Sequence, residues 1–190
     1  SYCDNLTGSP VCGPNVIYMD GTYQLCYNLT GSPVCEPNVI YMDNTYKGCN
    51  NLTGSAACGP KVISMGNTYS YCNNLTKAVC GPNVIYMNDT YSYCNRLIEA
   101  VCGDNVEHMN NTYAYCRSLK TPVCGNNVID MKYTYVGCKK LNQYVCGPNV
   151  KFMVGTYETA GTFANARQIN VKYDYPYYEE MRVENDNIFG

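Results

Sequence analysis

Hydrophobic and polar residues follow one pattern along this chain, and the pattern recurs seven times within residues 1–157. Each copy is 22 or 23 residues long and has the consensus Cys-x-x-Leu, a short variable stretch, then Val-Cys-Gly-x-Asn-Val-x-x-Met-x-x-Thr-Tyr. The leucine, methionine and Thr-Tyr positions have no exception. Sequence periods of this size are typical of solenoids and other repeat arrays. The seven copies occupy approximately 3–25, 26–48, 49–71, 72–93, 94–115, 116–137 and 138–159.

Within each copy, the pattern predicts β-structure. In the first copy the run at 15–19 is rich in β-prone residues, and Asp20-Gly21 then separates it from Thr22-Tyr23. Two turn-forming residues between β-prone runs predict a hairpin or a sharp corner. Helical periodicity is missing, and Gly, Pro and Asn recur too often for helices of useful length. The expected fold class is therefore all-β.

Two architectures satisfy this pattern. In a β-solenoid each copy is one coil, and equivalent residues stack in columns about 4.8 Å apart. In a string of small modules, each copy is a disulfide-tied hairpin with its own core. A unit of about 22 residues with one bridge buries too little apolar surface to stand alone. We therefore favour a disulfide-stapled, β-solenoid-like stack of seven coils, with the string of modules as the alternative.

Fourteen cysteines, two in every copy, predict disulfides. One pairing scheme joins the cysteines that flank the leucine segment, and the other joins cysteines across the Thr-Tyr segment. Ala160 stands where a cysteine follows the Thr-Tyr pair in every earlier copy, so the array lacks the cysteine that the first scheme would leave unpaired. We favour the first scheme, at roughly 2 to 3 kcal/mol for each bridge. Its pairs are Cys3 with Cys12, Cys26 with Cys35, Cys49 with Cys58, Cys72 with Cys80, Cys94 with Cys102, Cys116 with Cys124, and Cys138 with Cys146.

Other uses of the cysteines are less favoured. Zinc sites need Cys-x-x-Cys knuckles with four ligands gathered locally, and these spacings are too wide and too even, so we predict no metal site. Acceptor sequences for N-linked glycans indicate an oxidising, extracellular compartment. Arg96, Ser118 and Lys140 replace the recurring acceptor in the last three copies, which predicts a glycan-bearing half and a barer half. The predicted glycosylation sites are Asn5, Asn28, Asn51, Asn74, Asn88 and Asn110.

The charge of the chain does not indicate a nucleic-acid partner. Charged residues make up 15% of the chain and the net charge is −2. Residues 1–157 carry ten basic and nine acidic side chains, a net charge of +1, whereas residues 158–190 carry three and six, a net charge of −3. The sequence contains no candidate signal peptide or membrane span. We therefore expect a secreted chain whose tail differs in kind from the array.

The tail, residues 160–190, has no cysteine and is rich in tyrosine. Residues 168–175 alternate between polar and apolar, which predicts a strand with one apolar face. In one interpretation this strand caps the open end of the solenoid. In the other it is donated to a neighbouring subunit by β-augmentation, which would build a head-to-tail filament. The apolar positions of this assembly strand are Ile169, Val171, Tyr173 and Tyr175.

Two family resemblances are partial. The segment 10–26 resembles part of a Kazal inhibitor, with Pro-Val-Cys-Gly followed by Asp-Gly-Thr-Tyr and Cys, but each copy here has two cysteines where that family uses six. The segment 75–85 resembles the leucine-rich repeat pattern Leu-x-x-Leu-x-Leu-x-x-Asn-x-Leu. Glu107 and Lys151 then occupy its closing apolar place in later copies. We assign the chain to neither family on these grounds.

Catalysis is not predicted. His108, the only histidine, shares its column with Tyr18, Tyr41 and Tyr86, which indicates a place in the array. The sequence contains no nucleophile elbow, phosphate loop or His-carboxylate constellation. We therefore expect neither an enzyme nor a cofactor.

The favoured function is that of a secreted, glycosylated structural repeat protein, located outside the cell or at its surface. Its main partner would be itself, because stacked edges and a detachable strand favour self-assembly into a fibre, sheath or surface appendage. The alternative is an adhesion module that binds extracellular glycans through exposed tyrosines such as Tyr71, Tyr93 and Tyr115. A protease-inhibitor-like protein, or an ice-binding surface built on the threonine column, is less favoured.

Overall fold

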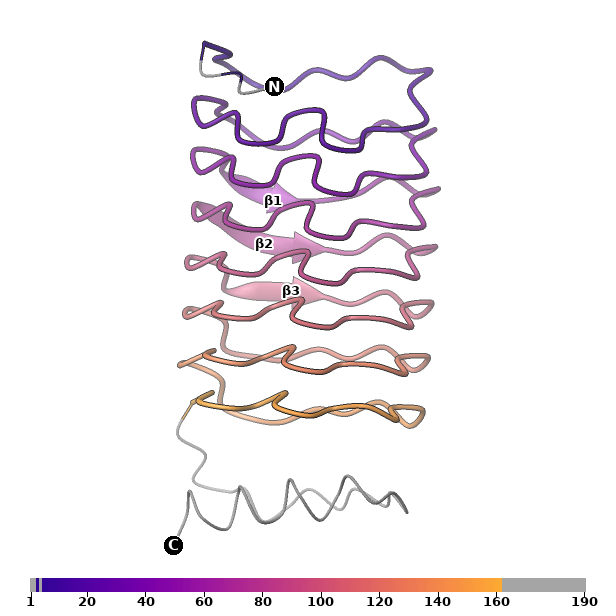
Figure 1. Cartoon of the computed structure of the whole chain (residues 1–190), viewed down its shortest axis with the longest axis vertical. Helices are drawn as coiled ribbons and strands as arrows, with labels where there is room; N and C mark the ends of the chain where they lie inside the picture. Colours follow the sequence, from indigo (N-terminus) through magenta and orange to yellow (C-terminus); the bar gives the residue numbers. More distant parts are fainter. Residues whose placement is uncertain (1–2, 4, 162–190) are drawn as a thin grey trace, which may run out of the picture.

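The computed structural model describes residue 3 and residues 5–161, which wind into a stack of parallel coils (Figure 1). Positions one repeat apart are direct neighbours in this stack. The predicted solenoid-like architecture is therefore confirmed, and a string of separate hairpins is not. The predicted assembly strand at 168–175 lies outside the described residues. One column of parallel bridges runs through Tyr18, Tyr41, Ser64, Tyr86, His108, Asp130 and Phe152.

One long side of the coils carries a parallel sheet, and we call it the strand side. Strands β1 (Gly54–Ala56), β2 (Leu75–Val79) and β3 (Glu99–Val101) follow one another in the sheet order β1-β2-β3. Strands β1 and β3 lie between the leucine and the second cysteine of a repeat, and β2 begins at the leucine itself, so all three occupy the stretch that is variable in the sequence. Residues 5–161 contain no helix, in agreement with the all-β class.

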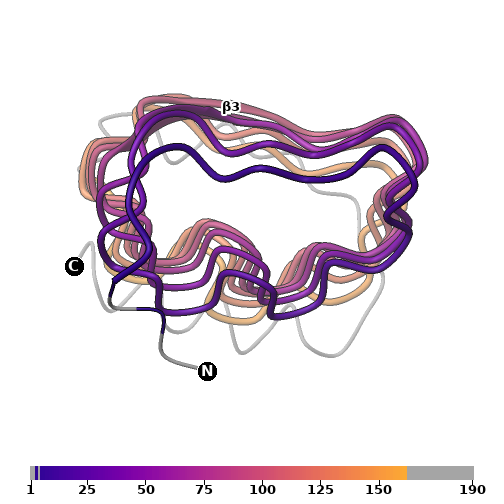
Figure 2. The same cartoon turned by 90° about the horizontal axis from the view of Figure 1, so that it is seen from above.

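The opposite long side consists of successive β-turns, and we call it the turn side (Figure 2). It runs from the methionine of one repeat to the next cysteine. In the third coil, the N–H groups of Thr68 and Ser70 donate to the carbonyls of Met65 and Asn67 at 3.2 and 3.1 Å. The N–H groups of Met65 and Asn67 donate instead to the following coil. Main-chain donors are thus used alternately within and between coils.

The turn positions agree with the sequence, but the hairpin does not. Asn44, Asn67 and Asp89 have φ of 57°, 55° and 57°, the left-handed conformation that Asn and Asp tolerate best after glycine. In the later copies these residues occupy the place of Gly21 in the predicted Asp20-Gly21 turn. The chain does not fold back on itself there, because every ladder between coils is parallel. The turns bend the chain within one coil and leave the pairing to the neighbouring coils.

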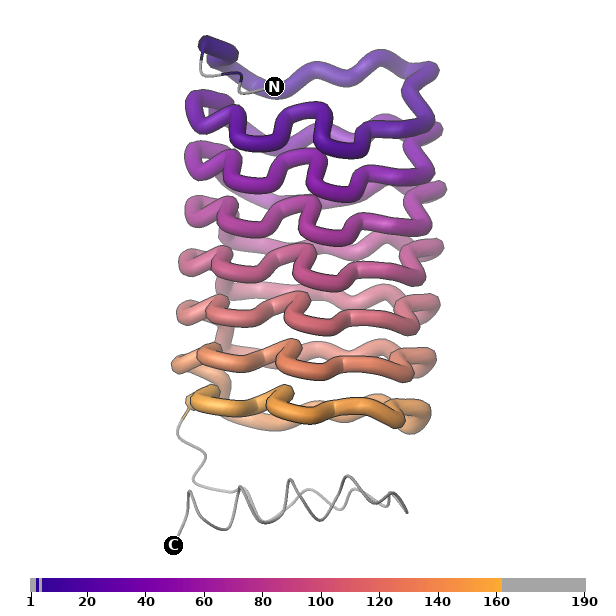
Figure 3. Tube along the Cα trace, viewed as in Figure 1, coloured from indigo at the N-terminus to yellow at the C-terminus, as the bar shows by residue number. Residues whose placement is uncertain are grey.

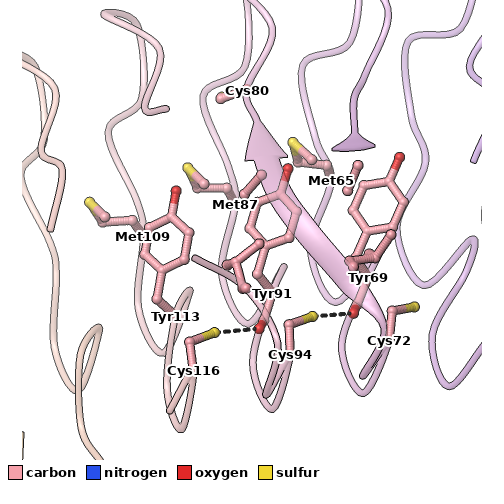
Figure 4. Packing of buried hydrophobic residues seen from close by; sticks show 14 of the residues in the cluster. Met65, Tyr69, Cys72, Cys80, Met87, Tyr91, Cys94, Met109, Tyr113 and Cys116 are labelled. Carbon is pink, nitrogen blue, oxygen red and sulfur yellow. Dashed lines mark hydrogen bonds between the residues drawn. The ribbon is translucent and has the colours of Figure 1, made fainter. Parts of the chain in front are cut away.

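Columns of like side chains fill the space between the two sides. Tyr69, Tyr91 and Tyr113 are fully buried, and their rings stack with centroids 5.5 and 5.6 Å apart (Figure 4). Buried leucine, methionine and valine columns run beside them. Burying one such side chain contributes roughly 1.5 to 3 kcal/mol. Each repeat therefore gains from its neighbours the core that it could not build alone.

The threonine column is also buried, and it links successive coils. The hydroxyl of Thr68 lies 2.8 Å from the Met65 carbonyl of its own coil and 2.6 Å from the Met42 carbonyl of the preceding coil. Thr90 lies in the same way at 2.6 Å from Met87 and 2.8 Å from Met65. Because these hydroxyls face the core, the column cannot form the exposed flat face that ice binding would need.

One glycine accommodates the two repeat lengths. Gly8, Gly31 and Gly54 occur in the three longer copies and have φ of 85°, 80° and 81°, a conformation that glycine adopts without strain. The fourth copy lacks this residue, and the pairing of β1 with β2 shifts register between Gly54 and Ser55. The one-residue difference in repeat length is thus accommodated on the strand side, and the outline of the coils persists along the stack (Figure 3).

Candidate functional site

Two cysteine columns run along the stack. The first contains Cys26 and its equivalents, and the second contains Cys35 and its equivalents. All fourteen cysteines are free thiols in the structure, so the predicted disulfides are not confirmed. Cys72 and Cys80 flank strand β2, whose five residues span about 16 Å when extended. A disulfide requires Cα atoms within about 4.4–6.8 Å. The favoured within-repeat pairing therefore does not fit this fold (Figure 4).

Thiols of the first column are hydrogen-bond donors between coils. The Sγ atoms of Cys94 and Cys116 donate to the carbonyls of Tyr69 and Tyr91, both at 3.1 Å (Figure 4). Desolvation by burial raises the pKa of the Cys94 thiol from 9.0 to about 12. The thiol thus stays protonated at neutral pH, and the recurrence of this cysteine has a structural reason other than a disulfide.

Sulfur atoms of the second column lie against the glycine that follows the next cysteine in the column. The N–H of Gly81 donates to Cys58 Sγ at 3.0 Å. A Cβ atom at Gly81 would lie 2.8 Å from that sulfur and 2.9 Å from the Gly59 carbonyl oxygen. A Cβ atom at Gly81 therefore has no room between the coils; glycine stands at this place in six of the seven copies, and Glu36 stands there in the second. The sequence did not indicate this role, although the glycines next to the cysteine column were its visible signal.

The predicted glycan acceptors of the recurring column form hydrogen bonds between coils. The Nδ2 atoms of Asn51 and Asn74 donate to the carbonyls of Tyr27 and Asn50 at 2.9 and 2.8 Å. Nδ2 is also the atom to which an N-linked glycan is attached. Asn51 is exposed and Asn74 is half-buried. A ladder of amides therefore explains the recurrence of this asparagine, and glycosylation stays a prediction.

Of the remaining predicted acceptors, two belong to the same column and two lie on the turn side. Asn5 and Asn28 are exposed in the first two coils. Asn88 and Asn110 lie on the turn side, where their Oδ1 atoms accept hydrogen bonds from the N–H groups of Asn110 and Lys132, both at 2.9 Å. Asn88 and Asn110 thus join coils on the turn side by side-chain hydrogen bonds, as Asn51 does after the first cysteine column.

The tyrosines predicted to bind glycans form a stack in which Tyr71 is exposed and Tyr93 and Tyr115 are half-buried. The ring centroids of Tyr71 and Tyr93 are 4.6 Å apart, and those of Tyr93 and Tyr115 are 4.7 Å apart. Because the faces of the rings cover one another, mainly edges remain accessible. The three hydroxyls make no hydrogen bond among the described residues, and none of them is a buried unsatisfied atom. Stacking of sugars on these ring faces is therefore not favoured, whereas the hydroxyl edges remain accessible for contact with a ligand.

His108 has a place in the array, as predicted. Its ring stacks on that of Tyr86 with centroids 5.2 Å apart. Within residues 3 and 5–161, no group of three or more His, Cys, Asp or Glu side chains is arranged to hold a metal ion. The same part of the chain has no helix long and apolar enough to span a membrane. The candidate functional surface is the exposed corner formed by the residues that follow the first cysteine column, together with the tyrosines that border it.

The fold resembles that of solved leucine-rich repeat proteins. One, a leucine-rich repeat protein from Bacteroides ovatus, has a TM-score of 0.60 and 15% identity over 80% of this chain. Another, a leucine-rich cell surface protein from Faecalibacterium prausnitzii, has a TM-score of 0.53 and 12% identity over 87% of this chain. The chain covers 47% and 62% of those two chains.

The partial leucine-rich repeat resemblance of the sequence thus has a structural basis. Glu107 and Lys151, which had counted against it, are half-buried and exposed in the structure, so their column does not require an apolar side chain. The chain matches no sequence-family description and no curated protein. The likeness in structure, at this level of identity, establishes that the chain folds as a leucine-rich-repeat-like solenoid.

Proposed function

We propose that this chain is a structural repeat protein of the cell surface or extracellular space, and that it assembles head to tail into a fibre, sheath or appendage. The solenoid architecture and its likeness to a leucine-rich cell surface protein support a surface location. Main-chain groups at both ends of the stack that have no hydrogen-bond partner among the described residues support assembly. This proposal concerns the array as described, residues 3 and 5–161.

The main-chain groups at the two ends are complementary. At internal junctions the N–H groups of Met131 and Tyr133 donate to carbonyls of the next coil at 2.8 and 2.9 Å. The equivalent N–H groups of the seventh coil, at Met153 and Gly155, have no acceptor among the described residues. An open β-edge of this kind is a template for another chain. The seventh coil therefore offers a row of donors in the geometry that other coils use to bind their neighbour.

The first coil offers the matching acceptors and an apolar rim. The carbonyls of Tyr18 and Asp20 accept no hydrogen bond within the described part of the chain, whereas their equivalents in every later coil do. Val11, Ile17 and Tyr18 are 78%, 44% and 66% exposed. A second copy placed on this end would bury these side chains and pair the main-chain groups. Such a contact is heterologous, so it continues into a filament unless the rotation closes a ring.

A charge on the apolar rim tests this proposal. The first coil's Tyr18→Lys should keep the chain monomeric, because a lysine on an exposed edge opposes pairing. Tyr41→Lys is the matched control, since it alters the same column inside the stack. The unaltered protein and the control should form rods that lengthen with concentration, by light scattering and electron microscopy. If the unaltered protein stays monomeric at every concentration, the proposal is wrong.

A further inference from the structure

The corner that follows the first cysteine column changes its chemistry along the stack. In the second to fourth coils its side chains are neutral, as at Asn51, Thr53 and Asn74. In the last three coils the same columns carry exposed cations, which we call the basic corner. Its members are Arg96, Arg117, Lys120, Lys139 and Lys140.

The charges of the basic corner are not neutralised by neighbouring carboxylates. The ion pairs in the described part of the chain join Lys77 to Glu99 and Lys132 to Asp130, both at 3.2 Å, and neither includes the corner. Arg96 Nη1 donates to the Asn74 side-chain oxygen at 3.2 Å, which holds one cation in its column. The chain as a whole has a net charge of −2, so this cluster of cations is a local excess of positive charge.

The tyrosine stack borders the basic corner. Tyr93 and Tyr115 directly precede the cysteines of the first column, and the corner residues directly follow them. Desolvation and the neighbouring tyrosines raise the pKa of the Tyr93 hydroxyl, the nearby charge of Arg117 opposes this rise, and the charge of Asp89 adds to it. A row of phenol hydroxyls therefore lies beside a row of cations, and both rows run along the stack axis.

We propose that the basic corner, with the hydroxyl edges of Tyr93 and Tyr115, binds an acidic polysaccharide along the stack axis. Arg117 and Lys139 occupy one column in adjacent coils, about 4.8 Å apart, and Arg96 and Lys140 occupy the next column two coils apart, so the cations can follow a linear polyanion. Carboxylate and sulfate groups accept charge-assisted hydrogen bonds from Arg and Lys, and phenol hydroxyls both donate to and accept from sugar hydroxyls. Single-stranded nucleic acid is disfavoured because it needs open aromatic faces for base stacking, and these faces are covered. The proposal is independent of head-to-tail assembly.

Binding of two acidic probes tests this proposal. Heparin carries sulfate and carboxylate groups, polygalacturonate carries carboxylates alone, and neutral dextran is the blank. A corner variant combines Arg117→Gln, Lys139→Gln and Lys140→Gln. The control variant combines Lys47→Gln, Lys61→Gln and Lys151→Gln, which removes the same charge elsewhere on the stack. Circular dichroism checks that both variants keep the fold, and thermophoresis at low and physiological salt measures the dissociation constants.

At least one acidic probe should bind, and the corner variant should bind it about tenfold more weakly than the control variant does. Tyr93→Phe combined with Tyr115→Phe should weaken binding about two- to fivefold without removing the ring stack. Equal losses in the corner and control variants would mean attraction by net charge alone and would overturn the proposal. Failure of both acidic probes to bind at low salt, or tighter binding of a single-stranded RNA oligonucleotide, would overturn it as well.

Discussion

The turn side and the strand side of this solenoid solve the same stacking problem in different ways. On the turn side every repeat keeps Met, Thr and Tyr, and each main-chain donor from Met65 to Cys72 has an acceptor. On the strand side the length of the repeat varies and the side chains change from neutral to charged. The regular strands β1, β2 and β3 lie on this variable side.

The difference separates two tasks within one coil. Buried hydroxyls, thiols and turns on the turn side define how one coil sits on the next. The strand side needs only its inward leucine and small residues, so its outward positions are open to surface chemistry. We therefore expect changes on the turn side and at the cysteine columns to cost much more stability than changes on the outward strand side.

Alkaline pH should have the largest effect, because the buried titratable groups belong to the core columns. Burial raises the pKa of Cys94 and of Cys58 from 9.0 to about 12. The folded state thus favours the protonated thiol. Its contribution to the free energy of unfolding is fully present below pH 9 and is lost as the pH rises from 9 to 12. Three pKa units correspond to about 4 kcal/mol for one fully buried thiol. Urea midpoints across this range should fall steeply, and a midpoint unchanged at pH 11 would contradict the account.

A methyl group in the glycine column should have the next largest effect. Gly81→Ala places Cβ against Cys58 Sγ and the Gly59 carbonyl, and overpacking of this kind costs about 1–3 kcal/mol. Gly13→Ala is the matched control, because the nearest atom to its Cβ is Val16 Cγ2 at 3.9 Å. The control should change stability by less than about 0.5 kcal/mol. Equal effects of the two changes on urea unfolding would refute the steric role of the column.

Removing single tyrosine hydroxyls should distinguish two coils of the core. The hydroxyl of Tyr69 donates to the Ala57 carbonyl at 2.6 Å, whereas the buried hydroxyl of Tyr113 has no hydrogen-bond partner within residues 3 and 5–161. Tyr69→Phe should therefore cost about 1 kcal/mol, and Tyr113→Phe should be neutral or stabilising. Chemical denaturation of both variants gives the comparison. A larger loss for Tyr113→Phe than for Tyr69→Phe would contradict it.

The smallest effect is expected on the strand side. Lys77 Nζ and Glu99 Oε2 join β2 to β3 at 3.2 Å, and both side chains are largely exposed. Glu99→Gln should cost about 0–1 kcal/mol, and the cost should vanish in high salt because exposed charges are screened. The measurement is urea unfolding at two salt concentrations. A loss greater than that of Gly81→Ala would reverse the comparison between the two sides.

Periodicity alone predicted most of this fold. Columns such as Met65 and Tyr69 identify the coil, because residues that never vary within one chain must share one environment. The turn at Gly66-Asn67 followed from its residue types. Spacing along the chain could not reveal whether the stretch between Cys72 and Cys80 loops or extends, and so it predicted a disulfide where a strand lies.

Candidate surfaces were harder to predict than the core. The partial exposure of the tyrosine stack followed from its amphipathic residues, but its covered ring faces depend on the φ near 60° of Tyr71, Tyr93 and Tyr115. The repeat alignment already places Arg117 and Lys139 in one column. The sequence did not show that this column lies beside the stacked tyrosine rings, which depends on the local backbone conformation.

The central claim is the register in which adjacent coils pair. An engineered pair of metal-binding histidines tests this register directly. Tyr86 and His108 are bridge partners in adjacent coils, so Tyr86→His should create two neighbouring histidines. Tyr41→His lies in the same column between Tyr18 and Ser64 and is the control. Nickel at about 100 times its dissociation constant should stabilise Tyr86→His by about 2.7 kcal/mol relative to its metal-free form. The account predicts a nickel-dependent rise in melting temperature for Tyr86→His alone, and identical nickel responses in the two variants would contradict it.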